Sequence, residues 1–156
     1  MINEHFNRLA QRYIDTVFRV ALNYLKSVPD AEDVTQNVFL KLLNEKKEFQ
    51  SDDHVRNWLI RVTVNECRNW TRSHWWHRES IDEYASKLAF EDPVHSDIFY
   101  AVMELPKKYR LPIYLYYYEE YSTQEIGDIL KLPKNTVCTH LKRGRELLKE
   151  FLQEVE

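Results

Sequence analysis

The residues best suited to binding chemistry lie in the segment Lys131–Lys149, which holds six Lys or Arg residues and one Glu. A helical repeat of about 100° per residue gives this segment a narrow inward arc of Val137, Leu141, Gly144 and Leu148. Small polar and cationic residues face away from that arc or flank it: Asn135, Thr136, Cys138, Thr139, Lys142, Arg143 and Arg145. Small polar side chains can approach base edges, and Lys or Arg reaches bases or phosphates. The pattern indicates DNA as the ligand and leaves a solvated or protein-binding face open as the alternative.

The residues just before the inward arc predict a helix-turn-helix. Ser122 and Glu125 have the spacing of a capping box, in which each side chain bonds the backbone N–H of the other residue. They predict a short helix from Thr123 to Leu130, which Leu132 and Pro133 end in a tight turn. A longer helix from about residue 134 to 151 follows. In this motif the second helix enters the major groove, so we expect it to be the recognition helix.

A second polar stripe lies in the first half of the chain, on a helix expected from Asp53 to Trp76. Its members fall within about 40° of one line: His54, Asn57, Arg61, Asn65, Arg68 and Arg72. The opposite arc is the expected core side, with Val55, Leu59, Val62, Thr63, Cys67 and Trp70. Arg56 and Glu66 also fall on the inner arc, and the pattern gives no account of them.

Aromatic residues accompany this stripe, with Trp75 and Trp76 at the expected end of the helix. Bases of single-stranded nucleic acid stack on such rings while Arg side chains hold the backbone. The alternative is that the Trp residues fill the core of a small domain, and for Trp58 and Trp70 we favour that alternative.

The segment Asp30–Leu43 has an acidic first turn, which suits the start of a helix. Its expected buried stripe consists of Ala31, Val34, Val38 and Leu42. The outward face consists of Asp33, Gln36, Asn37, Leu40 and Lys41. A row of carboxylate and amide groups with one exposed Leu is typical of a surface that binds a helical partner. Considered alone, the pattern fits a merely solvated surface better.

Composition excludes several classes of protein. The chain has 156 residues, 44% hydrophobic and 30% charged, with only two Gly, which is too few for the turns and phosphate loops of most β and nucleotide-binding α/β folds. No apolar run approaches the roughly 20 residues of a membrane span, and the N-terminus is too polar for a signal peptide, so we expect a cytoplasmic protein. Cys67 and Cys138 match no metal-ligand spacing and are expected to be reduced thiols, and no metal or other cofactor is expected. No nucleophile–base pair or phosphate loop is visible, so an enzyme is not expected.

We therefore expect an all-α protein made of two small helical domains on a flexible linker. The first domain covers residues 1–77, the acidic and weakly periodic linker covers 78–96, and the second domain covers 97–156. The net charge is −3, yet each half carries a basic stretch, Lys131–Lys149 in one and His54–Arg78 in the other. Two separate cationic surfaces fit a ligand with phosphates along its length.

Three segments in this order resemble the extracytoplasmic-function (ECF) group of the sigma-70 family, the promoter-specificity subunits of bacterial RNA polymerase. The segment DAEDVTQNVFLKLL is similar to region 2.2 of that family, and WLIRVTVNECRNWTR is similar to regions 2.3 and 2.4. The segment from Leu105 to Leu152 is similar to region 4. The resemblance covers nearly the whole chain apart from the linker.

The resemblance implies binding rather than catalysis, with core RNA polymerase, promoter DNA and an anti-sigma factor as partners. It implies core-polymerase contacts at Asp33, Gln36, Asn37, Leu40 and Lys41. It implies opening and capture of the minus-ten element at Arg61, Asn65, Arg68, Asn69 and Arg72. It implies reading of the minus-thirty-five element at Thr136, Cys138, Thr139, Lys142, Arg143 and Arg145. The linker is expected to thread toward the active-site cleft of the polymerase and the RNA exit path.

The chain departs from the family pattern at three positions of the recognition helix. Asn135 stands where Gly is usual, Cys138 stands where Arg or Lys is common, and Gly144 replaces a common Ala. Gly144 costs about 1 kcal/mol of helix propensity unless close packing requires it. A stand-alone helix-turn-helix regulator that binds its operator as a dimer is the alternative function, although it would not need the outward face of 30–43 or the Arg/Trp stripe.

Overall fold

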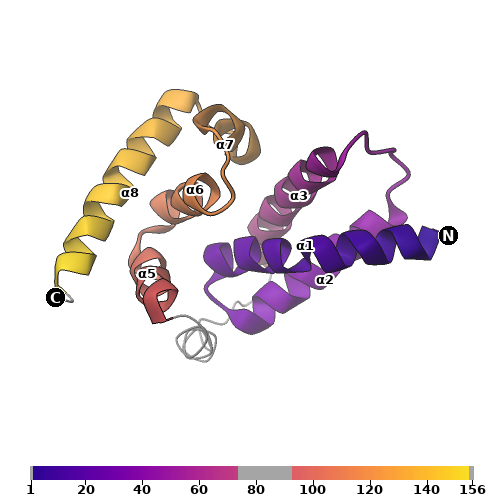
Figure 1. The fold of residues 1–156 in the computed structure, drawn as a ribbon, viewed down its shortest axis with the longest axis horizontal. Coiled ribbons are helices and arrows are strands. Elements are labelled where there is room, and N and C mark those ends of the chain that lie inside the picture. The colour runs from indigo at the N-terminus through magenta and orange to yellow at the C-terminus, as the bar shows by residue number, and fades with distance from the viewer. Residues whose placement is uncertain (1, 74–92, 155–156) are drawn as a thin grey trace. The chain divides into compact units, whose positions relative to one another are not determined.

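The computed structural model describes residues 2–73 and 93–154, and all the regular structure in these two ranges is helical. The helical architecture expected from the composition is therefore confirmed. The chain divides into two compact units, Met1–Arg78 and Glu79–Glu156, which are described separately below. The ribbon in Figure 1 follows the helices in chain order from indigo to yellow. The expected linker up to residue 92, together with Trp75 and Trp76, lies outside the described residues.

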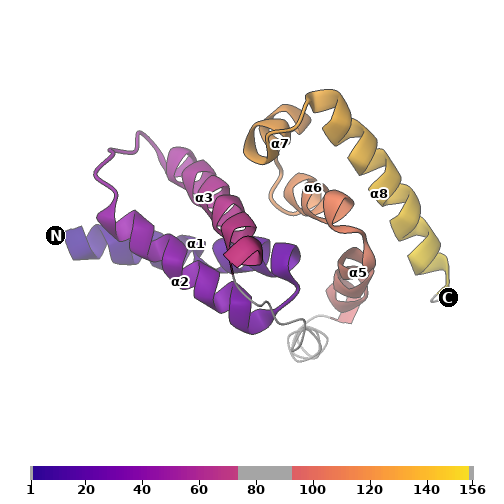
Figure 2. The ribbon, with the colours of Figure 1, turned by 180° about the vertical axis from the view of Figure 1, so that it is seen from behind.

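The first unit is a bundle of three helices, α1 (Ile2–Leu25), α2 (Val28–Asn44) and α3 (Asp52–Ser73). Each helix packs on the other two, as the views from the front and from behind both show (Figures 1 and 2). The largest fully buried side chains of the bundle include Val17, Val20, Val34, Val38 and Leu59. Val34, Val38 and Leu59 lie on the apolar stripes that the helical repeat predicts.

A short break at Lys26 and Ser27 separates α1 from α2, and Pro29 lies in the first turn of α2. Lys26 adopts the left-handed conformation with φ 55°, and its backbone N–H donates to the Leu22 carbonyl at 2.8 Å, which ends α1. Ser27 then caps α2, because its hydroxyl oxygen accepts from the backbone N–H of Asp30 at 3.3 Å. These two local devices fix where the chain reverses between the helices.

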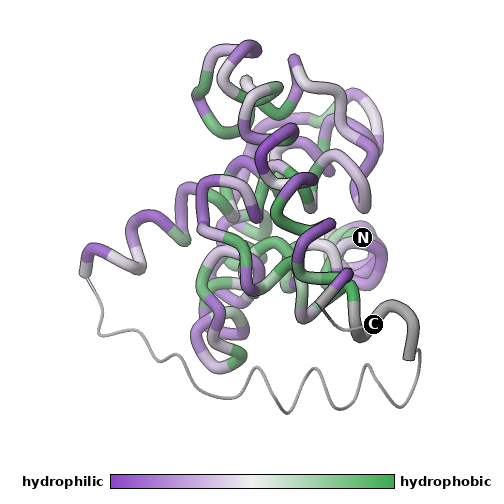
Figure 3. Tube along the Cα trace, turned by 90° about the vertical axis from the view of Figure 1, so that its left-hand side faces the viewer, coloured by the Kyte–Doolittle hydropathy of each residue, from purple (hydrophilic) through white to green (hydrophobic). Residues whose placement is uncertain are grey.

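The second unit contains α5 (Pro93–Glu104), α6 (Lys107–Tyr117), α7 (Thr123–Leu130) and α8 (Lys134–Glu154). The long helix α8 packs against the other three, and its inner side meets a core that includes Ile113, Leu115 and Ile126. A tube coloured by hydropathy shows apolar and polar residues alternating along the helices (Figure 3), as expected for amphipathic elements. None of the helices in the described ranges is long and apolar enough to cross a membrane.

Helix α6 begins at Lys107, directly after Pro106. Pro106 occupies the N-cap position with φ −54°, and the backbone N–H groups of Tyr109 and Arg110 both donate to its carbonyl. The buried Arg110 guanidinium donates to the Leu105 carbonyl at 3.2 Å across the break between α5 and α6. Burial lowers the pKa of Arg110 to about 10. This bond links the start of α6 to the end of α5.

Helices α6 and α8 approach each other closely at Gly144. A Cβ atom at Gly144 would lie 2.8 Å from Ile113 Cγ1 and 3.1 Å from Ile113 Cδ1. The missing side chain of Gly144 therefore makes room for Ile113, which is 1% exposed. Close packing accounts for a residue with poor helix propensity in the middle of α8.

Candidate nucleic-acid interface

The turn between α7 and α8 has the geometry of a helix-turn-helix. Ser122 and Glu125 form both bonds of the capping box: the Ser122 backbone N–H donates to Glu125 Oε1 at 3.0 Å, and the Glu125 N–H donates to Ser122 Oγ at 3.1 Å. Lys131 ends α7 in the left-handed conformation with φ 59°. The Leu132 N–H donates to the Gly127 carbonyl at 2.9 Å, and a Cβ at Gly127 would meet the Leu132 carbonyl oxygen at 2.7 Å. Gly127 is therefore required for the tight turn that sets the angle of α8.

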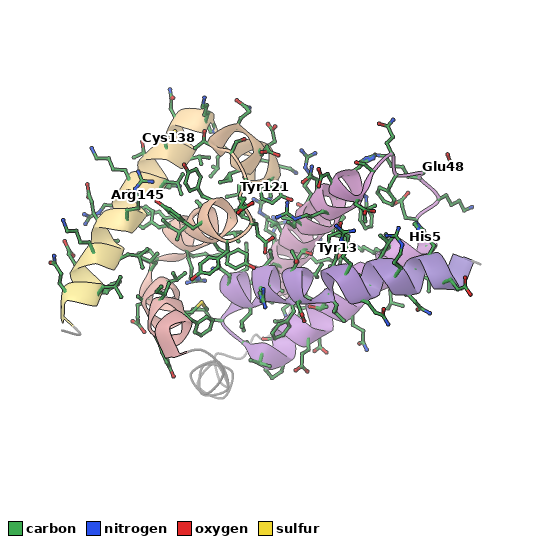
Figure 4. All side chains as sticks on the ribbon, in the orientation of Figure 1. His5, Tyr13, Glu48, Tyr121, Cys138 and Arg145 are labelled. Atoms are coloured by element: carbon green, nitrogen blue, oxygen red, sulfur yellow. The ribbon has the colours of Figure 1, made fainter. Side chains whose placement is uncertain are left out.

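Helix α8 presents a polar face opposite its buried side. Val137, Leu141 and Gly144 are buried, as the sequence pattern predicts, whereas Leu148, the fourth residue of the predicted arc, is half-buried, as is Thr136. The exposed residues of the predicted base-reading set are Cys138, Thr139, Lys142, Arg143 and Arg145. Figure 4 shows Cys138 near the N-terminal end of α8 and Arg145 further along the same helix. The small polar residues thus come first along the helix and the guanidinium groups follow them.

Three side chains of this face already have partners within the unit. Thr139 Oγ1 donates to the Asn135 carbonyl at 3.0 Å, which leaves the oxygen lone pairs and the methyl group of Thr139 available to a ligand. Arg143 Nη1 lies 3.2 Å from Glu146 Oε2, an exposed pair that contributes little to stability. Arg145 Nη1 donates to the hydroxyl oxygen of Tyr117 at 3.2 Å, so its guanidinium is directed toward α6.

His140 is a residue of α8 that the sequence pattern missed. Its ring centroid lies 5.5 Å from that of Tyr109, and the Lys108 ammonium lies 5.1 Å from the centre of the Tyr109 ring. Burial, and then the positive charge of Lys108, lower the pKa of His140 below its usual value of 6.5. Its Nδ1 atom is buried and has no hydrogen-bond partner among the described residues. The neutral imidazole therefore acts as a packing group behind the exposed face of α8.

Helix α3 carries the second polar face. Arg61, Asn65, Asn69 and Arg72 are exposed and Arg68 is half-buried. The buried arc differs from the predicted one, because Ile60 and Val64 are almost fully buried whereas Val62 and Trp70 are only half-buried. The cause is contact with both α1 and α2, which covers a wider part of α3 than one neighbour would.

An aromatic cluster lies where the chain enters α3. The Phe49 ring makes edge-on contacts with His54 at 5.2 Å and with Trp58 at 5.6 Å between ring centroids. His54 Nδ1 accepts from the Gln50 backbone N–H at 3.2 Å, which ties the ring to the segment before α3. Trp58 is half-buried, so it fills the core only in part. Phe49 was missed because it lies in a segment without helical periodicity.

Glu66, for which the sequence pattern gave no account, has a clear partner. Its carboxylate bonds with the Lys41 ammonium of α2, so the two residues form an ion pair between α2 and α3. The Glu66 side chain is 13% exposed and that of Lys41 is 55% exposed. An acidic side chain can therefore lie on the inner edge of α3 without leaving a buried charge unpaired.

The outward face of α2 continues into an apolar groove. Asp33, Gln36, Leu40 and Lys41 are exposed and Asn37 is half-buried. The groove of about 610 Å³ lies between α1 and α2, and its apolar lining includes Phe6, Ile14, Phe18, Phe39, Leu40 and Leu43. The carboxylates of Asp15 and Glu32 also belong to this lining. An apolar groove with acidic side chains fits a basic amphipathic helix.

The described residues contain no group of three or more His, Cys, Asp or Glu side chains placed to hold a metal ion. Cys67 is buried, Cys138 is exposed, and neither forms a disulfide. The polar surfaces of α3 and α8 are therefore the features with the clearest chemistry, and both suit binding to nucleic acid.

Two family models match the chain, "Sigma-70 region 2" over residues 9–77 and "Sigma-70, region 4" over residues 96–148. A similar protein is the ECF RNA polymerase sigma factor SigW of Bacillus subtilis, 29% identical over 168 residues, covering 96% of this chain and 90% of that protein. The ECF RNA polymerase sigma-E factor of Escherichia coli K12 is 26% identical, covering 95% of this chain and 86% of that protein.

Solved structures with the same fold include two protein complexes. RpoE from Bartonella quintana, in complex with the anti-sigma factor NepR, aligns with a TM-score of 0.70 at 18% identity, covering 96% of this chain and 98% of that one. CnrH, in complex with the cytosolic domain of CnrY, aligns with a TM-score of 0.68 at 22% identity, and the alignment covers 99% of this chain and 91% of that one. With both sigma-70 regions matched in order and ECF sigma factors similar over almost the full length, this chain belongs to the ECF group of the sigma-70 family.

Proposed function

We propose that the protein binds core RNA polymerase, directs it to a promoter and helps to separate the DNA strands at the start of transcription. Its role is binding, and the polymerase supplies the chemistry of RNA synthesis. We propose that it acts in the cytoplasm, where bacterial transcription occurs. The proposed domains are residues 1–77 for polymerase binding and the minus-ten element and residues 97–156 for the minus-thirty-five element, with 78–96 as the linker.

The observation that carries this proposal is the exposed polar face on one long helix of each unit, α3 in the first and α8 in the second. In both helices the opposite side is buried in the core of its unit. The polar side chains of both faces are therefore held on a rigid support, as a surface that reads a ligand requires.

In the second unit, α8 is proposed to lie in the major groove of the minus-thirty-five element. The residues proposed for this role are Thr136, Cys138, Thr139, Lys142, Arg143 and Arg145. A guanidinium at Arg143 can bond O6 and N7 of one guanine at once. The Arg145 guanidinium, which bonds Tyr117, suits a phosphate at the edge of the groove better than a base.

In the first unit, α3 is proposed to hold the opened minus-ten element through Arg61, Asn65, Arg68, Asn69 and Arg72. Separating the strands costs stacking and pairing energy, and capture of single-stranded bases offsets part of that cost. Asn side chains can bond the edges of bases, and the Arg side chains can hold the backbone. The alternation of amide and guanidinium groups along α3 supports this division of roles.

The outward face of α2 is proposed to dock on core polymerase through Asp33, Gln36, Asn37, Leu40 and Lys41. Leu40 is 54% exposed and also lines the groove between α1 and α2. The carboxylates beside that groove favour a basic, helical element of the polymerase as the partner. Affinity for DNA then comes from two modest sites tethered on one enzyme, where the effective concentration multiplies them.

An anti-sigma factor is proposed as the regulatory partner. One solved structure with this fold is a complex of the sigma factor RpoE with the anti-sigma factor NepR, and another is a complex of CnrH with the cytosolic domain of CnrY. A protein that covers the outward face of α2 would keep the chain from the polymerase.

Transcription in vitro tests the proposed function directly. Purified chain and core polymerase of the host bacterium are incubated with a library of genomic fragments, and the transcripts are sequenced. We expect defined start sites that need both proteins. The matched variant is Asp33→Ala with Gln36→Ala, because both side chains point outward and their loss spares the fold. We expect this variant to keep its thermal melt but to lose binding to core polymerase in a pull-down.

The opposite outcomes point to other conclusions. Normal core binding by the folded double variant would refute the docking role of α2. Tight binding of the chain alone to palindromic DNA, with no polymerase-dependent start sites, would identify a stand-alone regulator instead.

A further inference from the structure

A hollow of about 430 Å³ lies between the end of α6 and the C-terminal half of α8. Its lining combines apolar and polar side chains: Leu148, Leu152, Tyr117, Arg145, Lys149 and Gln153. Both charged residues of the described lining, Arg145 and Lys149, are positive. The hollow therefore suits an anion that also has an apolar part, as a sugar-phosphate backbone does.

The hollow adjoins the polar face of α8 that is proposed to enter the major groove. At 100° per residue, the exposed residues Lys142, Arg145 and Lys149 fall within about 60° of one another on one flank of the helix. Since Lys142 belongs to the proposed base-reading set, the two cations of the hollow continue that face along its edge. A helix in the major groove has a phosphate backbone on either side, so a group on its flank meets phosphates rather than bases.

Tyr117 is held at the rim of the hollow by contacts on two sides. Arg145 Nη1 donates to its hydroxyl oxygen at 3.2 Å, and the Tyr116 ring meets its ring edge-on at 4.9 Å between centroids. Tyr117 is nevertheless 49% exposed. Because the hydroxyl oxygen accepts from Arg145, the hydroxyl proton is left to donate to a ligand. Tyr117 and Arg145 can therefore each donate to the same phosphate group.

We propose that Tyr117, Arg145 and Lys149 form a binding site for one phosphate group of the DNA backbone, at the edge of the minus-thirty-five element. This flank site adds Lys149 and a residue of α6, Tyr117, to the groups proposed to contact DNA. The Tyr117 hydroxyl also orients the Arg145 guanidinium before DNA arrives, which lowers the cost of ordering that side chain on binding. The inference rests on the proposed function. The flank site adds the same affinity for every promoter sequence, because a phosphate carries no base identity.

The experiment uses holoenzyme assembled from core polymerase and the full chain. Its affinity is measured for a promoter fragment found by the transcription assay, and for all single-base variants of the minus-thirty-five element, at two salt concentrations. Tyr117→Phe keeps the ring and removes the hydroxyl. We expect it to weaken binding to every fragment by about two- to tenfold, the range for one hydrogen bond. Lys149→Ala is expected to lower the salt dependence of binding by about one unit, as the loss of one phosphate contact does.

Tyr116→Phe is the matched control, because it removes a hydroxyl from the neighbouring tyrosine, which is 38% exposed, and keeps the ring that contacts Tyr117. We expect it to bind every fragment as the wild type does. In an Arg145→Ala chain, Tyr117→Phe is expected to cost less affinity than in the wild type, since the two groups hold one phosphate. A titration with inorganic phosphate at constant ionic strength separates a backbone site from a site for a free anion, and we expect no saturable shift of the thermal melt.

Four results would overturn the inference. A Tyr117→Phe chain with a lower melting temperature but normal promoter affinity would show that the hydroxyl has a structural role alone. A changed base preference would make Tyr117 a base contact. Weaker binding of Tyr117→Phe and Lys149→Ala to core polymerase would identify the hollow as a protein contact, and saturable binding of inorganic phosphate would identify a site for a free anion. Failure of the wild-type holoenzyme to bind any promoter fragment would instead refute the proposed function itself.

Discussion

Replacing Gly144 by Ala has two opposing effects on stability, a gain in helix propensity and a cost in packing. In an unconstrained helix the change is expected to stabilise α8 by about 1 kcal/mol, because Ala has the higher helix propensity. Here the new methyl group would lie 2.8 Å from Ile113 Cγ1 and 3.4 Å from Tyr109 Cβ. Overpacking of this kind costs about 1–3 kcal/mol. Ile113 is fully buried and branched at Cβ, so its Cγ1 atom cannot rotate away easily.

The net expectation for Gly144→Ala is a destabilisation of up to about 2 kcal/mol, obtained by subtracting the propensity gain from the packing cost. For a domain of about 60–100 residues, each 1 kcal/mol lowers the melting temperature by about 4–8 °C. The assay is thermal unfolding followed by circular dichroism at the helical band. Unfolding of a two-domain chain need not be two-state. The unfolding curve of the variant is therefore compared with that of the wild-type full chain, and the transition that shifts is assigned to the second unit.

A second background makes the reasoning refutable. In an Ile113→Ala chain the obstructing Cγ1 atom is absent, so Gly144→Ala is expected to change sign and become stabilising. Stabilisation by about 1 kcal/mol in the wild-type background would show that α6 and α8 have room for a methyl group, and would refute the close-packing account of Gly144.

Three further outcomes follow from the geometry. Changing Asn65 and Arg68 to Ala is expected to spare formation of the closed promoter complex and to reduce the permanganate reactivity of thymines near the start site. Loss of the closed complex with unchanged opening of the DNA would show that the roles of the two units are the reverse of those proposed. Arg143→Ala is expected to weaken promoter binding by about 1–3 kcal/mol and to relax the base preference at one upstream base pair. An equal loss of affinity for all single-base promoter variants, with a salt dependence of binding lower by about one unit, would instead identify Arg143 as a phosphate contact. The pKa of His140 in the folded chain lies below 6.5, so the unfolded chain binds a proton at this residue more readily than the folded chain does. The neutral ring therefore contributes stability above pH 6.5, and this stability is lost as the pH falls below that value. A His140→Leu chain is expected to lose less stability than the wild type between pH 6.5 and 5, and equal pH slopes for the two chains would contradict the burial of this ring.

Features set by neighbours in the sequence were predictable, and features set by contacts between helices were not. The capping box of Ser122 and Glu125 and the inward arc of α8 follow from spacing alone. The structure confirms the capping box and three of the four residues of the arc, with Leu148 half-buried. The need for Gly144 became clear only when Ile113 of α6 was found against it. Glu66 had no explanation in its own helix, because its partner Lys41 lies 25 residues away in α2.

The buried side of α3 shows the same limit. A helical repeat finds the arc richest in apolar residues, but it does not say how many neighbours cover the helix. Two neighbours bury Ile60 and Val64 as well, which a single-arc prediction left out. His140 was missed for a related reason, since its pKa and packing depend on Lys108 and Tyr109 of α6.

The different exposure of the two thiols allows the binding of DNA to α8 to be followed by chemical labelling. Cys138 is exposed in the middle of the face of α8 proposed to read DNA, whereas Cys67 is 0% exposed in the core of the other unit. Alkylating reagents need an accessible thiolate, so a water-soluble maleimide is expected to label the folded chain at Cys138 alone. The labelling rate then measures occupancy of the recognition helix without any substitution or attached dye. Promoter DNA seated on α8 would protect this thiol, and the degree of protection along a series of promoter sequences would report which of them the unmodified protein prefers.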